Sequence, residues 1–378
     1  MITQTREILF SFSGEDTSYL THSLHPYPAK FPPQLPKKIL EDYAFKGQTV
    51  LDPFCGSGTT LVEARIFGAN AIGVDVNGLS VLLSKVKATP LTEQQLSIVK
   101  DFILKIEKEI PKWKSEKRPK IKIKEIEGQK HWFQNNVSEE ITFLLNEISK
   151  ETDKDIQNFL KIVLSSIIVK VSNQESDTRF AAIEKNITNG YTLEQFCKRA
   201  YEYNLRMSEF SKLVCNETEL KVYNADSRDL SFISDNSVDI IITSPPYANT
   251  YDYYLYHKFR KRWLDLDVKF AQYNEIGSRR EYSSLKKKKE KWNEDLIKCF
   301  AEMQRVLKPN HLAFIVIGDS VIKKELVKIE REISNFAPKI GFKVNDILSS
   351  DLSIHSKIFN PTYAQKGKKE HLIILEKI

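Results

Sequence analysis

The sequence predicts an α/β fold whose parallel sheet carries a helical insertion, and three observations support this prediction. Residues 238–242 form a short apolar, β-branched run that is typical of a strand buried on both faces. Residues 49–51 form a second such strand, which continues into a glycine-rich loop and then a helical pattern. Glycine nearly disappears between residues 90 and 220, where apolar residues recur at helical spacing.

The loop after residues 49–51 is suited to a small ligand that carries a positive charge. Gly56 and Gly58 allow the backbone to turn tightly, and the helix over residues 61–67 offers free N–H groups before Gly68 closes it. The loop lacks both the dinucleotide and the phosphate-loop glycine patterns, and Asp52 would repel a pyrophosphate. The amino-acid end of S-adenosylmethionine (SAM) therefore suits it better. We expect these cofactor-binding residues in the loop: Asp52, Pro53, Phe54, Gly56, Ser57, Gly58 and Thr59.

The next strand, residues 71–74, ends at Asp75, which Val76 follows. An acidic residue about twenty positions beyond a glycine loop, at the tip of the second strand, is placed to hold ribose hydroxyls. We therefore add Asp75 and Val76 to the predicted cofactor site.

Residues 90–220 predict a helical insertion, which divides the catalytic part into residues 1–89 and 221–378. Amphipathic helix patterns cover residues 141–148, 156–171 and 193–213. The basic segment 112–130 is either a flexible arm or a solvated face. The polar segment 172–180 contains Asn173 and Arg179, which could read base edges or hold phosphate; a capped loop between helices is the alternative. The insertion is a possible DNA target-recognition domain.

The strand over residues 238–242 ends in a stiff turn, Ser244-Pro245-Pro246-Tyr247. Ligands and reacting groups collect at the carboxyl ends of strands in an open α/β sheet. Two prolines fix φ and remove two backbone donors, so the turn presents carbonyl oxygens, a hydroxyl and an aromatic ring. A Pro-Pro pair after a strand can also be only a sharp stop.

The chain after this turn interleaves aromatic and basic residues over positions 249–263. Basic residues neutralise phosphates and aromatic rings stack on exposed bases, although part of this stretch must be a core helix. For the lysines, a solvated face is the alternative. The predicted DNA contacts here are Arg260, Arg262, Arg279, Arg280, Lys286, Lys287, Lys288 and Lys289.

The glycine loop and the Ser-Pro-Pro-Tyr turn, found together and in this order, resemble the SAM-binding and catalytic motifs of DNA amino-methyltransferases. This family methylates N4 of cytosine or N6 of adenine and includes restriction–modification enzymes. Three further segments resemble its motif X and its fifth and last strands: residues 25–32, 312–319 and 371–375. The resemblance implies a Rossmann-like class I SAM-dependent methyltransferase sheet.

Roles for single residues follow from this resemblance. Motif X, with Lys30 and Phe31, would close over the methionine end of SAM, and Asp226 and Ser227 would contact its adenine. Ser244 and the Pro245 carbonyl would accept hydrogen bonds from the amino group of a base flipped out of double-stranded DNA, and Tyr247 would stack on that base. A serine at the head of the turn favours cytosine N4 over adenine N6. A cognate restriction endonuclease is a possible partner.

The composition narrows the alternatives without removing them. The net charge of +7 suits a polyanionic partner, and the four cysteines have no metal-site spacing and suggest a reducing compartment. No apolar run reaches membrane length, so we expect a soluble cytoplasmic protein without a membrane partner or metal. An RNA guanine-N2 methyltransferase and a non-catalytic nucleic-acid-binding module remain alternatives. The oligomeric state is not predicted.

Overall fold

A seven-stranded sheet lies at the centre of the computed structural model, which describes residues 12, 14–115, 118–177, 179–215, 217–249, 252–285, 289–322, 325–351 and 368–378. The strand order is β10-β11-β7-β6-β1-β2-β5, and β11 runs antiparallel to both of its neighbours. The bounds are β1 (Thr49–Asp52), β2 (Asn70–Asp75), β5 (Leu220–Asn224), β6 (Val238–Thr243), β7 (Leu307–Gly318), β10 (Phe342–Asp351) and β11 (Lys369–Lys377).

The strand order places a topological switch point at β1. The chain adds β2 and β5 on one side of β1 and β6 and β7 on the other, and all five are parallel. Crevices at such reversals are where open α/β sheets bind ligands. The predicted Rossmann-like sheet is confirmed, and its switch point lies between the two motifs.

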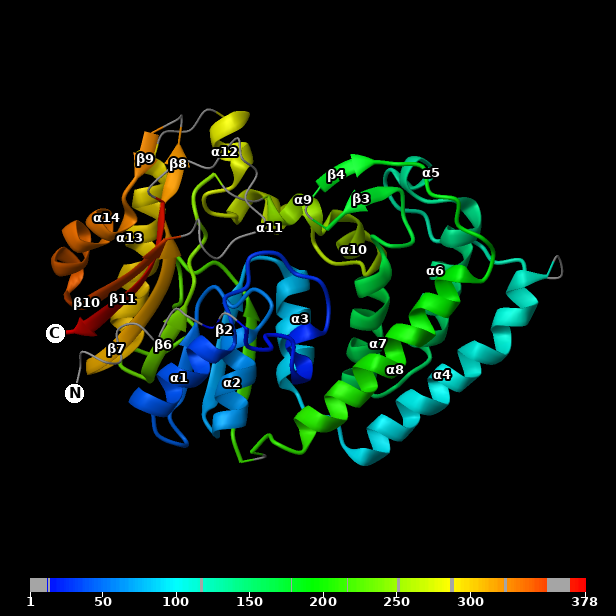
Figure 1. Cartoon of the computed structure of the whole chain (residues 1–378), viewed down its shortest axis with the longest axis horizontal. Coiled ribbons are helices and arrows are strands. Elements are labelled where there is room, and N and C mark those ends of the chain that lie inside the picture. Colours follow the sequence, from blue (N-terminus) through cyan, green and yellow to red (C-terminus); the bar gives the residue numbers. More distant parts are fainter. Residues whose placement is uncertain are drawn as a thin grey trace.

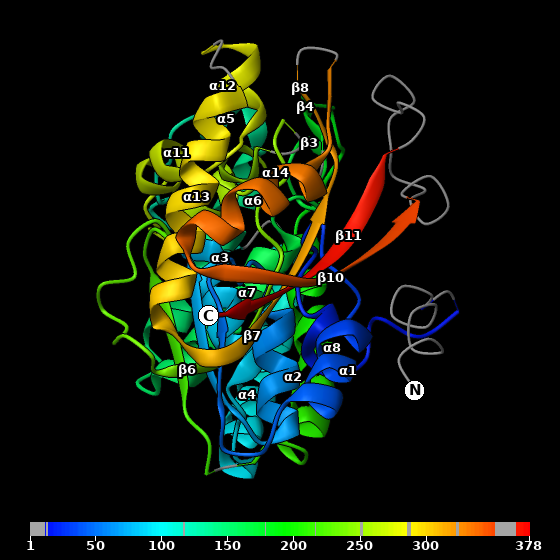
Figure 2. The same ribbon diagram turned by 90° about the vertical axis from the view of Figure 1, so that its left-hand side faces the viewer.

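Helices cover both faces of the sheet, which explains why its strands are continuous apolar runs. Val50 packs in one core, with α1 (Gln34–Tyr43), α2 (Thr59–Phe67) and α3 (Gly78–Ala88), whereas its neighbour Leu51 packs in the other. The second core contains residues of α13 (Lys289–Val306), α14 (Ile329–Phe336) and η3 (Ala337–Ile340). In Figure 2, α13 and α14 lie on one side of the β10–β11–β7 edge and α1 on the other.

A helical region follows α3 and fills the right of Figure 1. It comprises α4 (Glu93–Lys114), α5 (Gln129–Trp132), α6 (Asn135–Ser149), α7 (Lys154–Ile167), α8 (Tyr191–Ser211) and a hairpin of β3 (Gln174–Ser176) and β4 (Arg179–Ala182). Helix α7 packs on α3, and this contact attaches the helical region to the part of the chain that forms the central sheet. Lys124 Nζ contacts the Trp263 carbonyl at 2.8 Å and Asp265 at 2.6 Å, so this part of the basic segment is not a free arm.

Short elements gather beyond the carboxyl ends of the parallel strands. They are α9 (Tyr253–Tyr256), α10 (Lys258–Trp263), α11 (Lys269–Asn274), α12 (Arg279–Ser283) and a hairpin of β8 (Ser320–Ile322) and β9 (Glu325–Val327). Several of them, with the β3–β4 hairpin, lie along the top of Figure 1. The 3-10 helix η2 (Leu20–Ser23) precedes motif X. None of the helices in the described residues combines the length and hydropathy that a bilayer crossing requires.

Candidate active site

The two sequence motifs meet at the carboxyl ends of β1 and β6. The hydroxyl of Thr243, the last residue of β6, donates to Asp52 Oδ1 at 2.6 Å, joining residues that are 191 positions apart in the chain. Strands β1 and β6 are parallel neighbours, which is why their ends coincide. The glycine loop after β1 and the Ser244–Tyr247 turn after β6 therefore form one site.

Asp52 is held inside this site as a desolvated carboxyl group. Its side chain is 1% exposed, and Oδ1 also accepts from the Phe54 amide at 3.1 Å. Burial raises the pKa of Asp52 to about 6, although hydrogen bonds from Thr243, Thr60 and Phe54 oppose the shift. A buried carboxylate of this kind is stabilised most when a cationic group pairs with it, because the pairing offsets the cost of desolvating the charge.

Asp75 is bound directly to the glycine loop. Its carboxylate accepts from the Gly56 amide at 3.0 Å and from the Asn77 amide at 2.7 Å. Burial raises the pKa of Asp75 to about 6 as well. The loop after β1 and the acidic tip of β2 are thus one hydrogen-bonded unit, with Val76 half-buried next to it.

Asp52→Asn should weaken SAM binding roughly 10- to 150-fold, because a charged hydrogen bond contributes about 1.5–3 kcal/mol. The wild-type affinity should also fall below about pH 6, where Asp52 becomes protonated and loses its charge. This pH dependence should shrink in the variant and persist only through Asp75. Calorimetry at pH 5 and pH 7.5 measures both effects. Asp101→Asn, an exposed change on α4, is the control, and equal affinity of the Asp52 and Asp101 variants would contradict the assignment.

Motif X covers the glycine loop through Tyr27, a residue outside the predicted site. A Cβ atom on Gly56 would lie 3.5 Å from the Tyr27 ring, and the Tyr27 hydroxyl hydrogen-bonds Ser80 at 2.9 Å. The ring stacks on His257 at 5.1 Å and on Tyr253 at 5.8 Å between centroids. The aromatic residue between Pro26 and Pro28 is the signal that could have identified it.

The two residues that we predicted from motif X have other contacts in the structure. Lys30 Nζ donates to the His22 carbonyl at 3.0 Å, and Phe31 is half-buried against the core that contains α1 and α2. Their predicted contact with the methionine end of SAM stays a prediction.

Asp226 and Ser227 follow β5 and are both already bonded. Arg228 binds the Asp226 carboxylate at 2.6 Å and also reaches Asp295 at 3.0 Å. The buried Ser227 hydroxyl donates to the Pro53 carbonyl and so connects this segment to the glycine loop. Ser57 and Thr59 are buried in the loop and at the start of α2. If the adenine of SAM contacts Asp226, it would therefore also lie close to Arg228.

The Ser244–Tyr247 turn is fixed by two residues from distant elements. Trp292 of α13 donates its indole N–H to the Pro246 carbonyl at 3.3 Å, and the Tyr247 hydroxyl donates to Glu370 of β11 at 2.7 Å. Burial and the Glu370 charge raise the pKa of Tyr247 well above its ordinary value. No local pattern in the sequence indicates Trp292 or Glu370, because each lies on another strand or helix.

Arg260 must be withdrawn from the predicted DNA contacts. Its side chain is 1% exposed, where phosphate cannot reach it. Its guanidinium donates to the Ser165 carbonyl at 3.0 Å and pairs with Asp177 in the loop between β3 and β4. Arg262 is largely buried, pairs with Glu127 and lies over the Phe259 ring.

The other predicted DNA contacts lie at several places. Arg179 on β4 is 72% exposed and pairs with Glu175 at 2.9 Å, and the Asn173 side chain reaches the His131 carbonyl at 3.4 Å. Arg279 and Arg280 lie on α12. Lys286, Lys287 and Lys288 lie outside the described residues, as does the side chain of Lys289. These assignments remain untested predictions.

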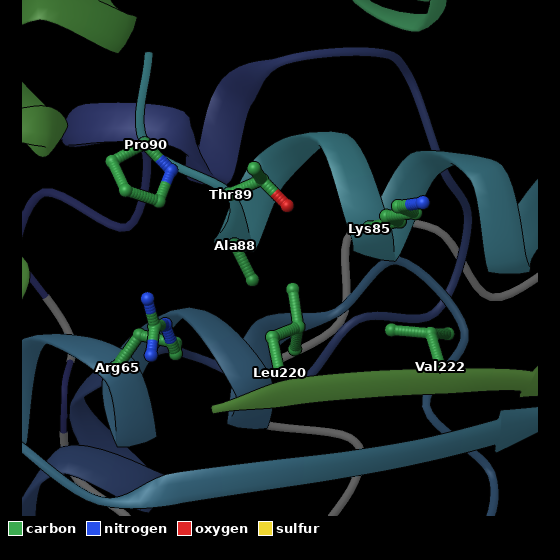
Figure 3. A pocket seen from close by; sticks show the side chains of 7 residues that line it. All are labelled: Arg65, Lys85, Ala88, Thr89, Pro90, Leu220 and Val222. Atoms are coloured by element: carbon green, nitrogen blue, oxygen red, sulfur yellow. The ribbon is translucent and has the colours of Figure 1, made fainter. Parts of the chain in front are cut away.

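A separate cavity of about 260 Å³ lies away from this site (Figure 3). It opens between the end of α3 and the start of β5, the edge strand, and so lies at the opposite end of β5 from Asp226. Its lining residues are Arg65, Lys85, Ala88, Thr89, Pro90, Leu220 and Val222. The cavity is therefore not the candidate active site.

Asp319, Glu330 and His371 form a polar network at the end of β7, with ligand-type atoms within 4.8 Å of one another. Asp319 accepts from Lys328 at 2.8 Å and from the Lys369 amide at 3.1 Å. Burial opposes ionisation of Asp319, yet hydrogen bonds from His371, Lys328 and the backbone lower its pKa overall. The network ties β7, β11 and α14 together beside the catalytic turn.

Comparison with known proteins identifies the family of the chain. Residues 7–85 and 238–371, more than half of the chain, match the family described as DNA methylase. The chain is similar to the Type II methyltransferase M.MvaI of Kocuria varians, at 27% identity over 87% of this chain and 83% of the relative. It is similar to M.MjaII of Methanocaldococcus jannaschii at 25% identity, over 84% and 74% of the two chains.

The chain is also similar to solved structures. A putative DNA modification methylase from Thermus thermophilus, complexed with S-adenosyl-L-methionine, covers 40% of this chain and 53% of its own at 20% identity and a TM-score of 0.26. A geranyl diphosphate methyltransferase in complex with SAM covers 95% and 96% of the two chains at 10% identity and a TM-score of 0.36. The fold assignment rests on the sheet itself.

Proposed function

This chain belongs to the DNA methylase family of SAM-dependent amino-methyltransferases of the restriction–modification type, and on that premise we propose that it methylates N4 of cytosine in double-stranded DNA. One observation carries the proposal. Ser244 heads the Pro-Pro-Tyr turn at the carboxyl end of β6, next to the Asp52 loop. This position lets the turn hold an amino group beside the methyl donor.

The residues of the turn supply acceptors for a poor nucleophile. The exocyclic nitrogen shares its lone pair with the ring, and hydrogen bonds to Ser244 Oγ and the Pro245 carbonyl would localise that pair on nitrogen. Trp292 already donates to the Pro246 carbonyl, and we assign the contacts with the substrate amino group to Ser244 and Pro245. SAM bound in this loop would supply the methyl group: the nitrogen–carbon bond would form as the carbon–sulfur bond breaks, sulfur would keep the electron pair, and the methylated nitrogen would release one proton to water.

We assign each part of SAM to a different group of residues. Asp52 would pair with the ammonium group, the Gly56–Gly58 backbone would pass beneath the methionine, and Asp75 would accept from the ribose hydroxyls. Tyr27 lies over the same loop and would shield the sulfonium from water. The base must leave the duplex to reach this site, and Tyr247 would stack on its exposed face.

The helical region, residues 90–220, is our candidate for reading the DNA sequence. Its β3–β4 hairpin lies with α9 and α11 on the top edge of Figure 1. Phe180 of β4 stacks on Phe259 of α10, with 5.6 Å between ring centroids, while Arg179 faces solvent. A two-stranded ribbon fits the major groove of DNA, so the hairpin can approach a duplex whose base enters the site. A cognate restriction endonuclease would cut the same sequence.

Identification of the modified nucleoside distinguishes cytosine from adenine as the target base. Genomic DNA from a host without modification, treated with the protein and SAM and digested to nucleosides, should yield N4-methylcytosine in mass spectrometry. A Ser244→Ala variant prepared in the same way provides the blank. Recovery of N6-methyladenine alone would replace cytosine by adenine and leave the mechanism of the turn unchanged. Recovery of neither product would contradict the function.

A further inference from the structure

Arg65 is a buried cation for which the described part of the chain supplies no anionic partner. It lies in the last turn of α2 and is 5% exposed. No carboxylate among the described residues acts on its guanidinium, and burial lowers the pKa of that group below its ordinary value. A buried arginine is rarely left unpaired, because pairing has to offset the lost hydration of its charge. The surroundings of Arg65 are therefore a place to look for an anion site.

The hydrogen bonds of Arg65 leave one edge of its guanidinium unused. Nη1 donates to the carbonyl and to the hydroxyl of Thr218. Nε is shielded from solvent and has no acceptor, and within the described residues none is recorded for Nη2. Nε and Nη2 lie on the same edge of the planar group, and their paired N–H bonds match two oxygens of one oxyanion.

The cavity beside Arg65 adds a hydroxyl and a second positive charge. Arg65 rises from α2 toward the end of α3, and the Thr89 hydroxyl points into the same space (Figure 3). Lys85, one turn earlier on α3, is exposed and also lines the cavity. None of the described lining residues is acidic. The lining therefore carries a net positive charge.

The carbonyl ends of the two helices do not replace an anion here. Arg65 and Lys85 lie in the last turns of α2 and α3, where the partial negative charge of a helix end favours a cation. However, the Gly68 amide already donates to the carbonyls of Ala64 and Arg65. The helix end thus provides attraction for the charge and no hydrogen-bond acceptor for Nε or Nη2.

The size and position of the cavity favour a free inorganic ion. Its volume is about 260 Å³. This volume is below the roughly 300–1,000 Å³ that is usual for pockets that enclose drug-sized ligands. The cavity also lies at the opposite end of β5 from Asp226, so a duplex with a base at the Ser244–Tyr247 turn would approach the other end of the strands.

We propose that Arg65, Lys85 and Thr89 form a binding site for an inorganic oxyanion of the size of phosphate. The Nε–Nη2 edge of Arg65 binds two of its oxygens, Thr89 donates to a third, and Lys85 adds charge at the rim. The ion connects α2 to the end of α3 and stabilises the folded protein by mass action. Neither SAM nor DNA takes part, so the site is independent of the proposed function.

Calorimetric titration of the full chain with sodium phosphate, without SAM or DNA, tests the site. Sodium chloride keeps the ionic strength constant. We expect saturable binding of a single phosphate per chain, which Arg65→Gln should abolish. Lys85→Gln should weaken it about two- to fivefold, as expected for a partly exposed charge. Thr89→Val should weaken it by about two- to tenfold, the equivalent of one hydrogen bond.

Lys100→Gln is the matched control, because it removes an exposed lysine from α4 and should leave phosphate affinity unchanged. The Lys85 and Thr89 variants keep the test decisive if Arg65→Gln does not fold. Absence of saturable binding to the wild-type protein would overturn the proposal, and so would equal affinity in the Lys85, Thr89 and Lys100 variants.

Thermal unfolding in phosphate separates a site from a general salt effect. Phosphate strengthens burial in most proteins. A specific site should therefore raise the melting temperature of the wild-type protein more than that of Lys85→Gln or Thr89→Val. An equal rise in all variants would contradict the site. Displacement of bound phosphate by a short DNA duplex would overturn the assignment to a free ion in favour of a DNA phosphate.

Discussion

Tyr247→Ala should reduce the methylation rate roughly 30- to 1000-fold while SAM binding is retained. The ring is expected to stack on the flipped base, worth about 1–3 kcal/mol, and its loss also removes the hydrogen bond to Glu370, worth about 1 kcal/mol. We expect SAM to be held by the loop after β1 and by Asp75, which are hydrogen-bonded to each other and do not require the Tyr247 side chain. Single-turnover kinetics with labelled SAM and calorimetry with SAM alone measure the two quantities.

Tyr247→Phe is the matched variant for this experiment. It keeps the stacking surface, so most of the activity that the alanine variant loses should return. Equal rates for the alanine and phenylalanine variants would mean that the ring contributes nothing beyond its hydroxyl. Loss of SAM affinity in the alanine variant would show that the turn supports the cofactor loop as well.

Gly58→Ala should destabilise the protein by about 2–4 kcal/mol and abolish measurable SAM binding. Gly58 has φ of +82°, and a Cβ atom there would lie 2.8 Å from the Ser84 Cα of α3. That neighbour is backbone in a buried helix, so it cannot move aside as a flexible side chain could. The glycine loop must shift instead, and this shift would move its backbone amides away from the place where SAM is expected to bind.

The Gly47→Ala variant distinguishes the backbone strain of a residue with positive φ from the steric clash of an added Cβ atom. Gly47 has nearly the same φ, +81°, but nothing lies within 4 Å of an added Cβ atom. This control should lose only about 1–2 kcal/mol from the left-handed backbone and bind SAM normally. Denaturant unfolding of both variants compares them, and equal losses would show that the contact with Ser84 relaxes freely.

Much of the fold could be predicted because several of its strands can be recognised from the local sequence alone. The apolar runs at 49–51, 71–74 and 238–242 coincide with β1, β2 and β6, since both faces of those strands are buried. Gly68 has φ of +90° and ends α2 as expected. Periodicity also located α6, α7 and α8, whose apolar stripes lie in one core.

The contacts that hold the site together could not be predicted. A local sequence pattern indicates whether a residue lies in a helix or a strand, but it does not indicate which distant residues it contacts. Arg260 stands in a basic, aromatic segment that is typical of a nucleic-acid surface. Its burial follows from Ser165 and Asp177, which the helical region supplies from about ninety positions earlier. Glu370 likewise has an ordinary strand context, and only the antiparallel placement of β11 brings it to Tyr247.

The cavity between α3 and β5 marks the point where the chain leaves the sheet and later returns to it. Pro90 and Leu220 line the same small space, so the exit and the return lie side by side (Figure 3). Loop-closure entropy grows only with the logarithm of length, so a long excursion between neighbouring points costs the sheet little more than a short turn would. Chain entropy therefore places little limit on the length of the helical region, whereas its packing on α3 and its bonds to Arg260 constrain its sequence.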